Sequence, residues 1–185
     1  MQKNNPITST KDFYTNIHRK YISACILLPF KDKILIVKKS ATQQWGLPGG
    51  ILKDFESPEV GCIRESFEEI NIEVSIKTLF HVYYAIANLA NEFTSGDSIH
   101  FVFLGNELLD DQIKQIAFSD NEIDEIKLVA PDDIGDYINE NLLKAINLGF
   151  SGIIYSNLER SVKSIIEEES NYNSLAQKSN VNQHL

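Results

Sequence analysis

Three glutamates, Glu65, Glu68 and Glu69, stand at positions i, i+3 and i+4 within residues 64–69. On a helix this spacing places all three on one face, where like charges repel each other by a few tenths of a kcal/mol per pair. A chain that keeps such a cluster has a use for concentrated negative charge. Carboxylate oxygens are the ligands that a hard divalent cation such as Mg²⁺ prefers, so the spacing predicts a metal-binding helix face.

A helix is predicted for the residues that carry this cluster. Ser57 is a favourable N-cap, and Pro58 suits the first helical position. The helix continues to about Ile70, and Asn71 can adopt the left-handed conformation that ends a helix. The side of the helix expected to face the core carries Val60, Ile63 and Phe67.

β-prone segments lie on both sides of this helix in the sequence. Before it, residues 21–30 and 34–39 predict two strands of a hairpin, and residues 45–50 predict a short strand that ends in a glycine pair. At such a pair the backbone can turn sharply or approach a ligand. The strands predicted after the helix lie within residues 72–86, 98–104 and, as the last one, 123–129.

Two further helices complete the predicted elements, a short one within residues 110–122 and one from Pro131 to about Asn147. This order predicts an α+β fold, an α/β/α sandwich in which helices flank a mixed β-sheet. Its domain is expected over residues 18–158. A loose arm is expected over 1–17, and a polar, partly disordered tail over 159–185, where residues 161–169 suggest a frayed helix.

Composition restricts the classes of partner. The chain has 185 residues, of which 43% are hydrophobic, and this suits one domain with a substantial core. Its net charge of −9 argues against a long nucleic acid, whose binding depends on Lys and Arg neutralising phosphates. Small phosphorylated substrates stay compatible, because a bound metal reverses the local charge.

The location expected from the sequence is the cytoplasm, with no membrane attachment. Cys25 and Cys62 show no metal-binding or redox spacing and are predicted to be free, buried thiols. The apolar run at residues 22–30 is too short to span a bilayer and lacks the features of a signal peptide.

Residues 50–72 hold Gly50, Glu56, Arg64, Glu65, Glu68, Glu69 and Ile72 at fixed spacing. This pattern resembles the Nudix box, the signature of the Nudix hydrolase family. Asn71 and Ser66 depart from the pattern, replacing a glycine and an aliphatic residue, and Phe55 stands where the family often has glycine. No acidic or basic position of the box is missing.

The resemblance implies hydrolysis of a pyrophosphate bond in a nucleoside diphosphate derivative, by water attack at phosphorus. It implies Mg²⁺ as cofactor, with Mn²⁺ as a substitute, and a small nucleotide-type substrate. A homodimer, common among relatives, is left open. The metal ligands that it implies are the backbone carbonyl of Gly49 and the carboxylates of Glu56, Glu65, Glu68 and Glu69.

The resemblance also implies catalytic roles within and beyond the box. Glu65 and Glu69 are the expected principal ligands, and Glu69 is counted among the catalytic residues. Arg64 is expected to hold Glu56 or Glu68 through a bidentate ion pair. The general base stays open between Glu68, a third ligand in the alternative, and two later glutamates. These later candidates are Glu122 and Glu125.

The substrate is only loosely constrained. Residues 87–89 lack the proline or tyrosine that marks the ADP-ribose and dinucleoside polyphosphate subgroups. Residues 96–103 are similar to a strand of small bacterial Nudix proteins and indicate a nucleoside triphosphate or a nucleotide-sugar-like diphosphate. Structural roles are the expectation for the other candidate contacts, His18, His81, His100, His184, Trp45, Tyr83 and Tyr84.

Two other functions compete with hydrolysis. The chain could be a Nudix module that senses a nucleotide without cleaving it, although it keeps every box glutamate. It could also be an interaction protein that uses the polar tail as its partner arm.

Overall fold

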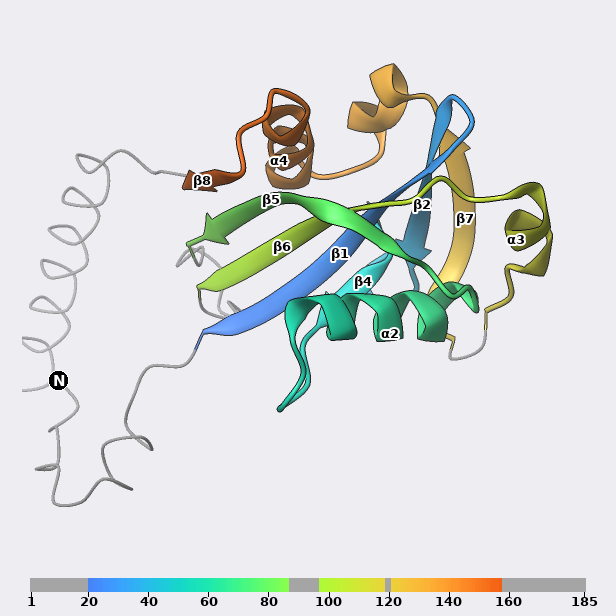
Figure 1. The fold of residues 1–185 in the computed structure, drawn as a ribbon, viewed down its shortest axis with the longest axis horizontal. Coiled ribbons are helices and arrows are strands. Elements are labelled where there is room, and N and C mark those ends of the chain that lie inside the picture. Colours follow the sequence, from blue (N-terminus) through green and yellow to red (C-terminus); the bar gives the residue numbers. More distant parts are fainter. Residues whose placement is uncertain (1–19, 87–96, 119–120, 158–185) are drawn as a thin grey trace, which may run out of the picture.

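A mixed β-sheet forms the framework of the protein in the computed structural model, which describes residues 20–86, 97–118 and 121–157 (Figure 1). Within these residues the strands follow the order β3-β2-β1-β6-β5-β8, while β4 pairs with β1 and β7 pairs with β2. The strands are β1 (Tyr21–Phe30), β2 (Lys33–Lys39), β3 (Trp45–Gly46), β4 (Gly49–Ile51), β5 (Ile76–Ala85), β6 (Ser98–Gly105), β7 (Ile123–Val129) and β8 (Tyr155–Asn157).

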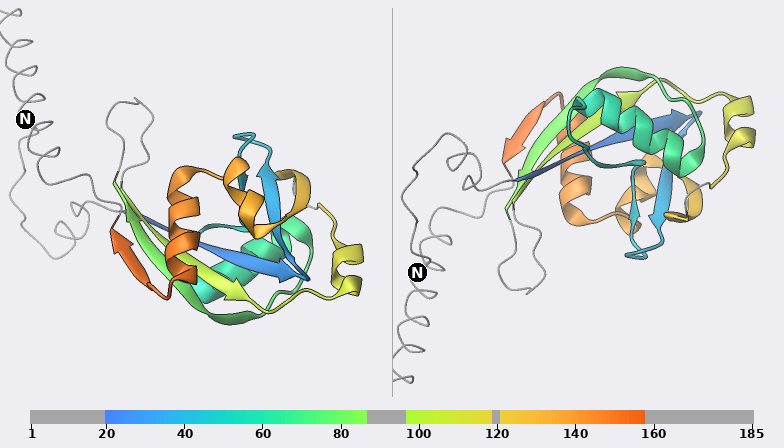
Figure 2. Two further views of the ribbon diagram at one scale, coloured as in Figure 1. Left: turned by 90° about the horizontal axis from the view of Figure 1, so that it is seen from above. Right: turned by 90° about the horizontal axis from the view of Figure 1, so that it is seen from below.

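Helices cover both faces of this sheet, as the two views of Figure 2 show. Helix α2 (Pro58–Ile70) packs on one face against β1 and β4, whereas α4 (Glu140–Phe150) packs on the other against β5. Helix α3 (Asp110–Gln115) and the 3-10 helix η1 (Pro131–Asp136) lie in the connections around β7. The predicted mixed sheet flanked by helices is therefore confirmed.

Strand β1 is the shared element of the sheet. It forms the predicted hairpin with β2 only at its tip, where Leu28 pairs with Leu35 and Phe30 with Lys33. Nearer its start, β1 pairs in parallel with β6 and antiparallel with β4. Strand β2 then continues against β7, which brings residues before and within β7 close to the end of β2.

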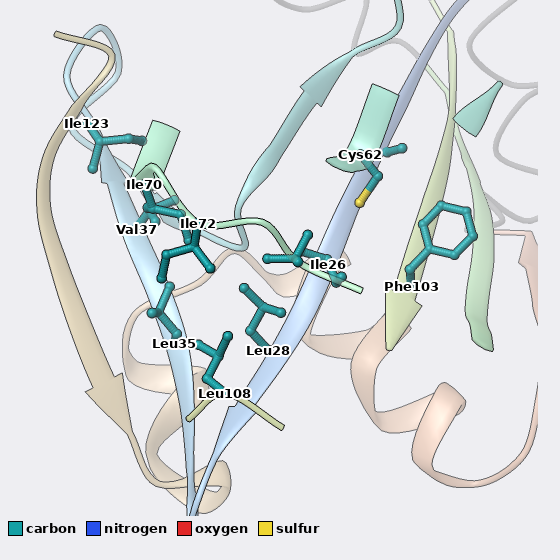
Figure 3. Close-up of a cluster of buried hydrophobic side chains, with 12 residues drawn as sticks. Ile26, Leu28, Leu35, Val37, Cys62, Ile70, Ile72, Phe103, Leu108 and Ile123 are labelled. Atoms are coloured by element: carbon teal, nitrogen blue, oxygen red, sulfur yellow. The ribbon is translucent and has the colours of Figure 1, made fainter. Parts of the chain in front are cut away.

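Two apolar cores lie on opposite sides of β1, because successive side chains of a strand point to opposite faces. Ile26 and Leu28 belong to the core beneath α2, while Leu27 belongs to the core beneath α4. Figure 3 shows the first core, in which the end of α2 and the following residues close over β1 and β2. The labelled members are Ile26, Leu28, Leu35, Val37, Cys62, Ile70, Ile72, Phe103, Leu108 and Ile123.

The predicted inward face of α2 is wrong. Val60, Ile63 and Phe67 are 55%, 37% and 48% exposed, respectively. A Cβ on Gly61 would lie 2.4 Å from the Leu52 side chain, so this side of the helix must stay small for close packing. The buried positions of α2 are Gly61, Cys62, Ser66, Glu69 and Ile70.

Ser66 is accommodated in this buried face without an unsatisfied polar group. Its hydroxyl donates a hydrogen bond to the carbonyl of Cys62, one turn earlier, at 2.8 Å. Cys62 and Cys25 are free thiols, as predicted, but only Cys62 is also buried as expected, whereas Cys25 is half-buried. Small side chains therefore let α2 approach the sheet closely enough for its carboxylates to reach β4.

The predicted single helix from residue 131 to about 147 is wrong as well. The segment divides into η1 and α4, because Asn139 starts a new helix by accepting a hydrogen bond from the Leu142 N–H at 3.0 Å. Residues 123–129 are also not the last strand, since β8 pairs in parallel with β5. His81 is fully buried and bonds Ile153 O and Ser156 Oγ, which fastens β8 to the sheet.

The predicted arm at 1–17 and the tail at 159–185, including its frayed helix, lie outside the described residues. The division of the chain into these parts and a domain at 18–158 stays a prediction. None of the helices in the described part of the chain has both the length and the apolar character needed to cross a bilayer.

Candidate active site

Helix α2 has the ends that its sequence predicted. The Ser57 side chain accepts a hydrogen bond from the Val60 N–H at 3.4 Å, and Pro58 is the first helical residue. Asn71 takes the left-handed conformation, with φ 56° and ψ 34°, and its N–H bonds the Phe67 carbonyl. The helix thus carries Glu65, Glu68 and Glu69 over one continuous stretch, while Glu56 lies in the loop just before it.

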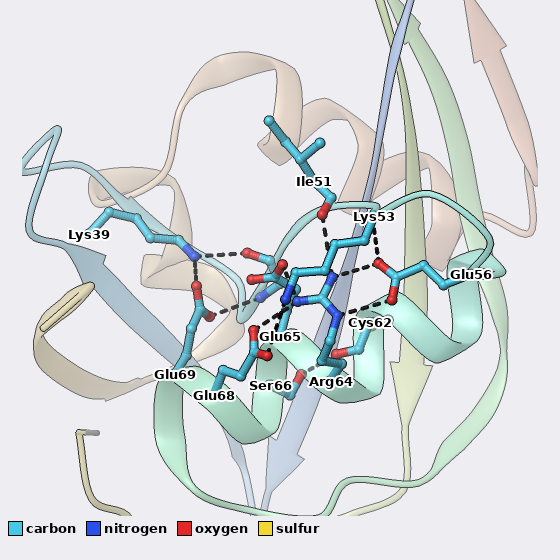
Figure 4. Close-up of polar contacts among 11 residues, drawn as sticks. Lys39, Ile51, Lys53, Glu56, Cys62, Arg64, Glu65, Ser66, Glu68 and Glu69 are labelled. Carbon is cyan, nitrogen blue, oxygen red and sulfur yellow. Dashed lines mark hydrogen bonds and ion pairs between the residues drawn. The ribbon is translucent and has the colours of Figure 1, made fainter. Parts of the chain in front are cut away.

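Glu69 is the buried centre of the site, with a relative exposure of 0% (Figure 4). Its Oε2 accepts a hydrogen bond from the Gly49 N–H at 3.0 Å, and its Oε1 is paired with the ammonium of Lys39. Desolvation raises the pKa of Glu69, while Lys39 and the Gly49 N–H oppose that shift by stabilising its charged form. Burial of this carboxylate therefore depends on two specific partners.

The glycine pair lets the backbone approach these carboxylates. Gly49 has a φ of 139°, and a Cβ there would lie 2.2 Å from the Ala24 carbonyl oxygen. A Cβ on Gly50 would lie 2.5 Å from the Glu65 carboxylate. The predicted close approach at this turn is thus present, and it is made toward the helix carboxylates.

Gly49→Ala is expected to destabilise the protein by about 3 kcal/mol or more, because both the left-handed backbone and the contact with Ala24 resist a methyl group. Urea denaturation would measure this loss. Gly46→Ala is the matched control: a Cβ on Gly46 meets nothing within 4 Å. Its stability should stay within about 0.5 kcal/mol of the parent. Equal stability of the two variants would contradict the packing at Gly49.

Arg64 joins three carboxylates into one network. Its Nε and an Nη bond the two oxygens of Glu56 at 3.0 and 2.6 Å, which is the expected bidentate pair. Its other Nη bonds Glu65 at 2.6 Å and Glu68 at 2.8 Å. The hydrogen bonds from Arg64, with one from the Lys53 N–H, lower the pKa of Glu56 to about 2. Arg64 therefore keeps Glu56 ionised and in place.

Three carboxylates come together as a candidate cation site. Oxygens of Glu65, Glu69 and Glu122 lie within 4.8 Å of one another. Glu122 comes just before β7, and the Ser40 N–H bonds its carbonyl at 2.8 Å, next to the end of β2. Glu125, opposite Lys38 in the β2–β7 ladder, is not a member of this group.

Glu56 and Glu68 were also predicted as ligands, but they are not members of the candidate cation group. Both are hydrogen-bonded to Arg64. Both carboxylate oxygens of Glu56 accept hydrogen bonds from Arg64, and one of them also accepts from the Lys53 N–H. Glu68 is 40% exposed and is paired with Arg64 and with Lys53. Arg64 thus bonds Glu56, Glu65 and Glu68, and of these three only Glu65 also belongs to the candidate cation group.

The residues present fit a hard divalent cation. The ammonium of Lys39 already occupies such a place, because it bonds the Gly49 carbonyl oxygen at 2.8 Å as well as Glu69. A cation is therefore accepted by the same carboxylate and carbonyl oxygens that Mg²⁺ prefers. The sequence pattern does not predict Lys39 as a site residue. The only local signal was a basic pair, Lys38 and Lys39, ending an apolar strand before the glycine turn.

Phe55 stands where the sequence pattern led us to expect glycine, and its backbone adopts a conformation that glycine favours. Its φ is 68°, in the left-handed region that glycine adopts most easily, and its side chain is fully exposed. The loop between β4 and α2 thus keeps this conformation despite the side chain.

The histidines and aromatic residues considered as substrate contacts have structural partners where they lie within the described residues. His100 bonds the Ser23 and Ser98 hydroxyls at 2.6 and 2.7 Å and stacks on Tyr83. Tyr84 donates to Asp97 at 2.6 Å, and Trp45 packs edge-on against Tyr137. His18 and His184 lie outside the described residues.

His100 is expected to make stability depend on pH. Burial lowers its pKa to about 4, below the value of about 6.5 expected in the unfolded chain. Between these values the unfolded chain binds the extra proton, so the free energy of unfolding should fall by up to about 3 kcal/mol as pH drops from 6.5 to 4. Urea denaturation across this range should show a shallower decline in His100→Gln. If the free energies of unfolding of the parent and His100→Gln declined in parallel with pH, the assigned contribution of His100 would be contradicted.

The chain is similar in sequence and in fold to known proteins. The family model described as NUDIX domain matches residues 18–147. A MutT-like protein of Streptomyces ambofaciens is 39% identical over 51 residues, which cover 28% of this chain and only 33% of that protein.

Two solved structures share the fold. The MutT protein of Methanosarcina mazei Go1 aligns with a TM-score of 0.60 at 20% identity, over 74% of this chain and 98% of its own. A NUDIX hydrolase of Nitrosomonas europaea gives a TM-score of 0.58 at 19% identity, over 74% and 93%.

Proposed function

The chain belongs to the Nudix hydrolase family, and we propose that it hydrolyses a pyrophosphate bond in a nucleoside diphosphate derivative or nucleoside triphosphate. The observation that carries this proposal is the buried Glu69, which lies with Glu65 and Glu122 and shares the Lys39 ammonium with the Gly49 carbonyl. Such a concentration of oxygen ligands next to a glycine turn suits an anionic substrate bound through a divalent cation.

We assign the cation to Glu65, Glu69, Glu122 and the Gly49 carbonyl, with Mg²⁺ as the cofactor and Mn²⁺ as a substitute. A bound divalent cation would neutralise pyrophosphate charge and supply Lewis acidity. Glu69 is held for this task by the Gly49 N–H, and Glu65 by Arg64. The carboxylates are therefore oriented before any ligand arrives.

Glu68 is our candidate for the group that orients and deprotonates the attacking water. Desolvation opposes ionisation of Glu68, but hydrogen bonds from Arg64 and Lys53 outweigh it and lower the pKa. Glu68 is thereby kept as an ionised acceptor beside the ligand cluster. The place of Glu122 with Glu65 and Glu69 favours it as a ligand over a base.

A panel of nucleoside diphosphate derivatives and nucleoside triphosphates, incubated with Mg²⁺ or Mn²⁺, tests this function. Phosphate is measured with and without an added phosphatase, which separates direct release of phosphate from release of a phosphomonoester. Glu68→Gln should lower kcat with an unchanged metal requirement, whereas Glu122→Gln should shift the metal requirement. A protein that binds nucleotides of the panel and cleaves none would instead be a sensing module.

We also propose a substrate class, a cellular location and an assembly state for the protein. The partner is a small nucleotide-type substrate, and we place the enzyme in the cytoplasm, with a homodimer as the assembly to test by light scattering. A partner arm in residues 159–185 falls outside the described residues. The intact set of box glutamates, most of them buried or arginine-held, supports hydrolysis over sensing alone.

A further inference from the structure

Lys39 lies where the proposed cation would be held. Its Nζ donates to the Gly49 carbonyl oxygen at 2.8 Å and is paired with Oε1 of Glu69. Both oxygens belong to the ligand set assigned above. A lysine ammonium is a compact point charge that makes up to three such contacts. The chain therefore fills part of its own metal site with a positive side chain.

We propose that Lys39 is an internal counter-ion that exchanges with the divalent cation. This inference rests on the proposed function and extends it to how the metal site is filled. Without metal, the ammonium neutralises Glu69. When the cation binds, it takes over Glu69 and the Gly49 carbonyl, and the Lys39 ammonium moves toward the phosphates of the substrate.

Burial of Glu69 makes a partner necessary in both states. A carboxylate with 0% exposure is costly unless it is paired and hydrogen-bonded. The Gly49 N–H satisfies one oxygen, and Lys39 supplies the compensating charge to the other. Removal of Lys39 without metal would leave this charge uncompensated, so the apo site keeps its shape through the lysine.

Exchange is favoured because two cations bound to the same two oxygens would lie very close together. A divalent ion and an ammonium at those atoms would repel each other strongly at such short range. The Lys39 side chain is 29% exposed and has a flexible four-carbon stem, so the displaced ammonium can reach solvent. Pyrophosphate oxygens near the cation would then offer it charge-assisted hydrogen bonds.

A titration with Mn²⁺ in the absence of nucleotide tests the exchange, with free Mn²⁺ followed by electron paramagnetic resonance. Lys39→Met should bind Mn²⁺ about tenfold more tightly than the parent, because the ion no longer has to displace a bound cation. Lys38→Met is the matched control. It removes the same charge from the neighbouring residue of β2, which among the described residues makes no hydrogen bond or ion pair with Gly49 or Glu69.

The Mn²⁺ affinity of Lys38→Met shows whether tighter binding comes from the loss of the Lys39 contacts or only from the loss of one positive charge. Lys38→Met should stay within about twofold of the parent. Equal affinities of Lys39→Met and the parent, or equal gains in both variants, would overturn the exchange.

Chemical labelling of the unmodified full-length protein gives a test that needs no variant to fold. Acetylation of each lysine is measured by mass spectrometry with and without Mg²⁺. Labelling of Lys39 should rise several-fold with Mg²⁺, because its ammonium is released from Glu69, while exposed Lys33 should not change. Labelling of Lys39 that is unchanged or reduced by saturating Mg²⁺ would overturn the proposal.

Neither measurement uses a nucleotide, so the two proposals can fail separately. If Lys39→Met binds Mn²⁺ more tightly but the parent cleaves no nucleotide, the exchange is supported and the proposed hydrolysis is contradicted. If the protein hydrolyses nucleotides but the parent and Lys39→Met bind Mn²⁺ equally well, the proposed function stands and the exchange is contradicted.

Discussion

Glu69→Gln should lower kcat by about 10³-fold, which corresponds to about 4 kcal/mol of lost transition-state stabilisation. The glutamine has nearly the same shape and can still accept from the Gly49 N–H, but it no longer offers a negative charge to the cation. Its amide would also present hydrogens to the Lys39 ammonium, which only donates. Steady-state kinetics on the best substrate of the panel, over a range of Mg²⁺ concentrations, would measure the loss.

The stability of Glu69→Gln decides how its kinetics are interpreted. The substitution keeps packing volume, so we expect a loss of only about 1–2 kcal/mol in the free energy of unfolding. Glu73→Gln is the control, because Glu73 is exposed and lies beyond the C-terminal end of α2. Parent-like turnover in a folded Glu69→Gln protein would sink the assignment of this carboxylate to the reaction.

Arg64→Met is the second substitution with a large expected effect. It leaves Glu56, Glu65 and Glu68 facing one another without the guanidinium that now bonds all three. Removing one partner of such a partly buried network should destabilise the protein by about 3 kcal/mol. Because Glu65 and Glu68 lose their orientation, kcat should fall about 100-fold.

The stability loss in Arg64→Met should depend on pH in a defined direction. Arg64 holds the pKa of Glu56 at about 2, below the ordinary value of a glutamate. That stabilisation is present above the unfolded pKa of about 4.3 and is lost as pH falls toward 2. The difference in stability between parent and variant should therefore narrow over this range in urea denaturation.

Arg64→Lys separates charge from geometry. A lysine keeps the positive charge but cannot bond both Glu56 oxygens and two further carboxylates from one planar group. We expect intermediate stability and activity close to that of Arg64→Met. Parent-like activity in Arg64→Lys would show that positive charge alone suffices, against the role assigned to the guanidinium geometry.

Local features of the chain were predictable because they depend on neighbouring residues. Ser57, Pro58 and Asn71 define the ends of α2 through hydrogen bonds and backbone angles within one turn. The i, i+3, i+4 spacing of the glutamates places them on one side of that helix by geometry alone. The sequence by itself thus determined the helix, its acidic face and the close-packed glycine turn.

Contacts between distant segments required the tertiary structure. Pairing of β2 with β7 decides that Glu122, rather than Glu125, reaches Glu65 and Glu69, and no local pattern distinguishes the two. Packing of α2 on β1 and β4 decides which face is buried, so that Cys62 lies inside while Phe67 is half exposed. Hydrophobic periodicity predicted a different face, because it takes no account of the small side chains that a helix needs to pack closely on its sheet.

The place of Lys39 shows the same division. The sequence by itself determined a set of carboxylates suited to a cation, since charge and spacing are local properties. Only the tertiary structure placed a lysine from β2 on Glu69 and the Gly49 carbonyl. The physical reason is that the chain must neutralise a carboxylate it buries, and the partner it uses is chosen by proximity in the fold, 30 residues away along the sequence.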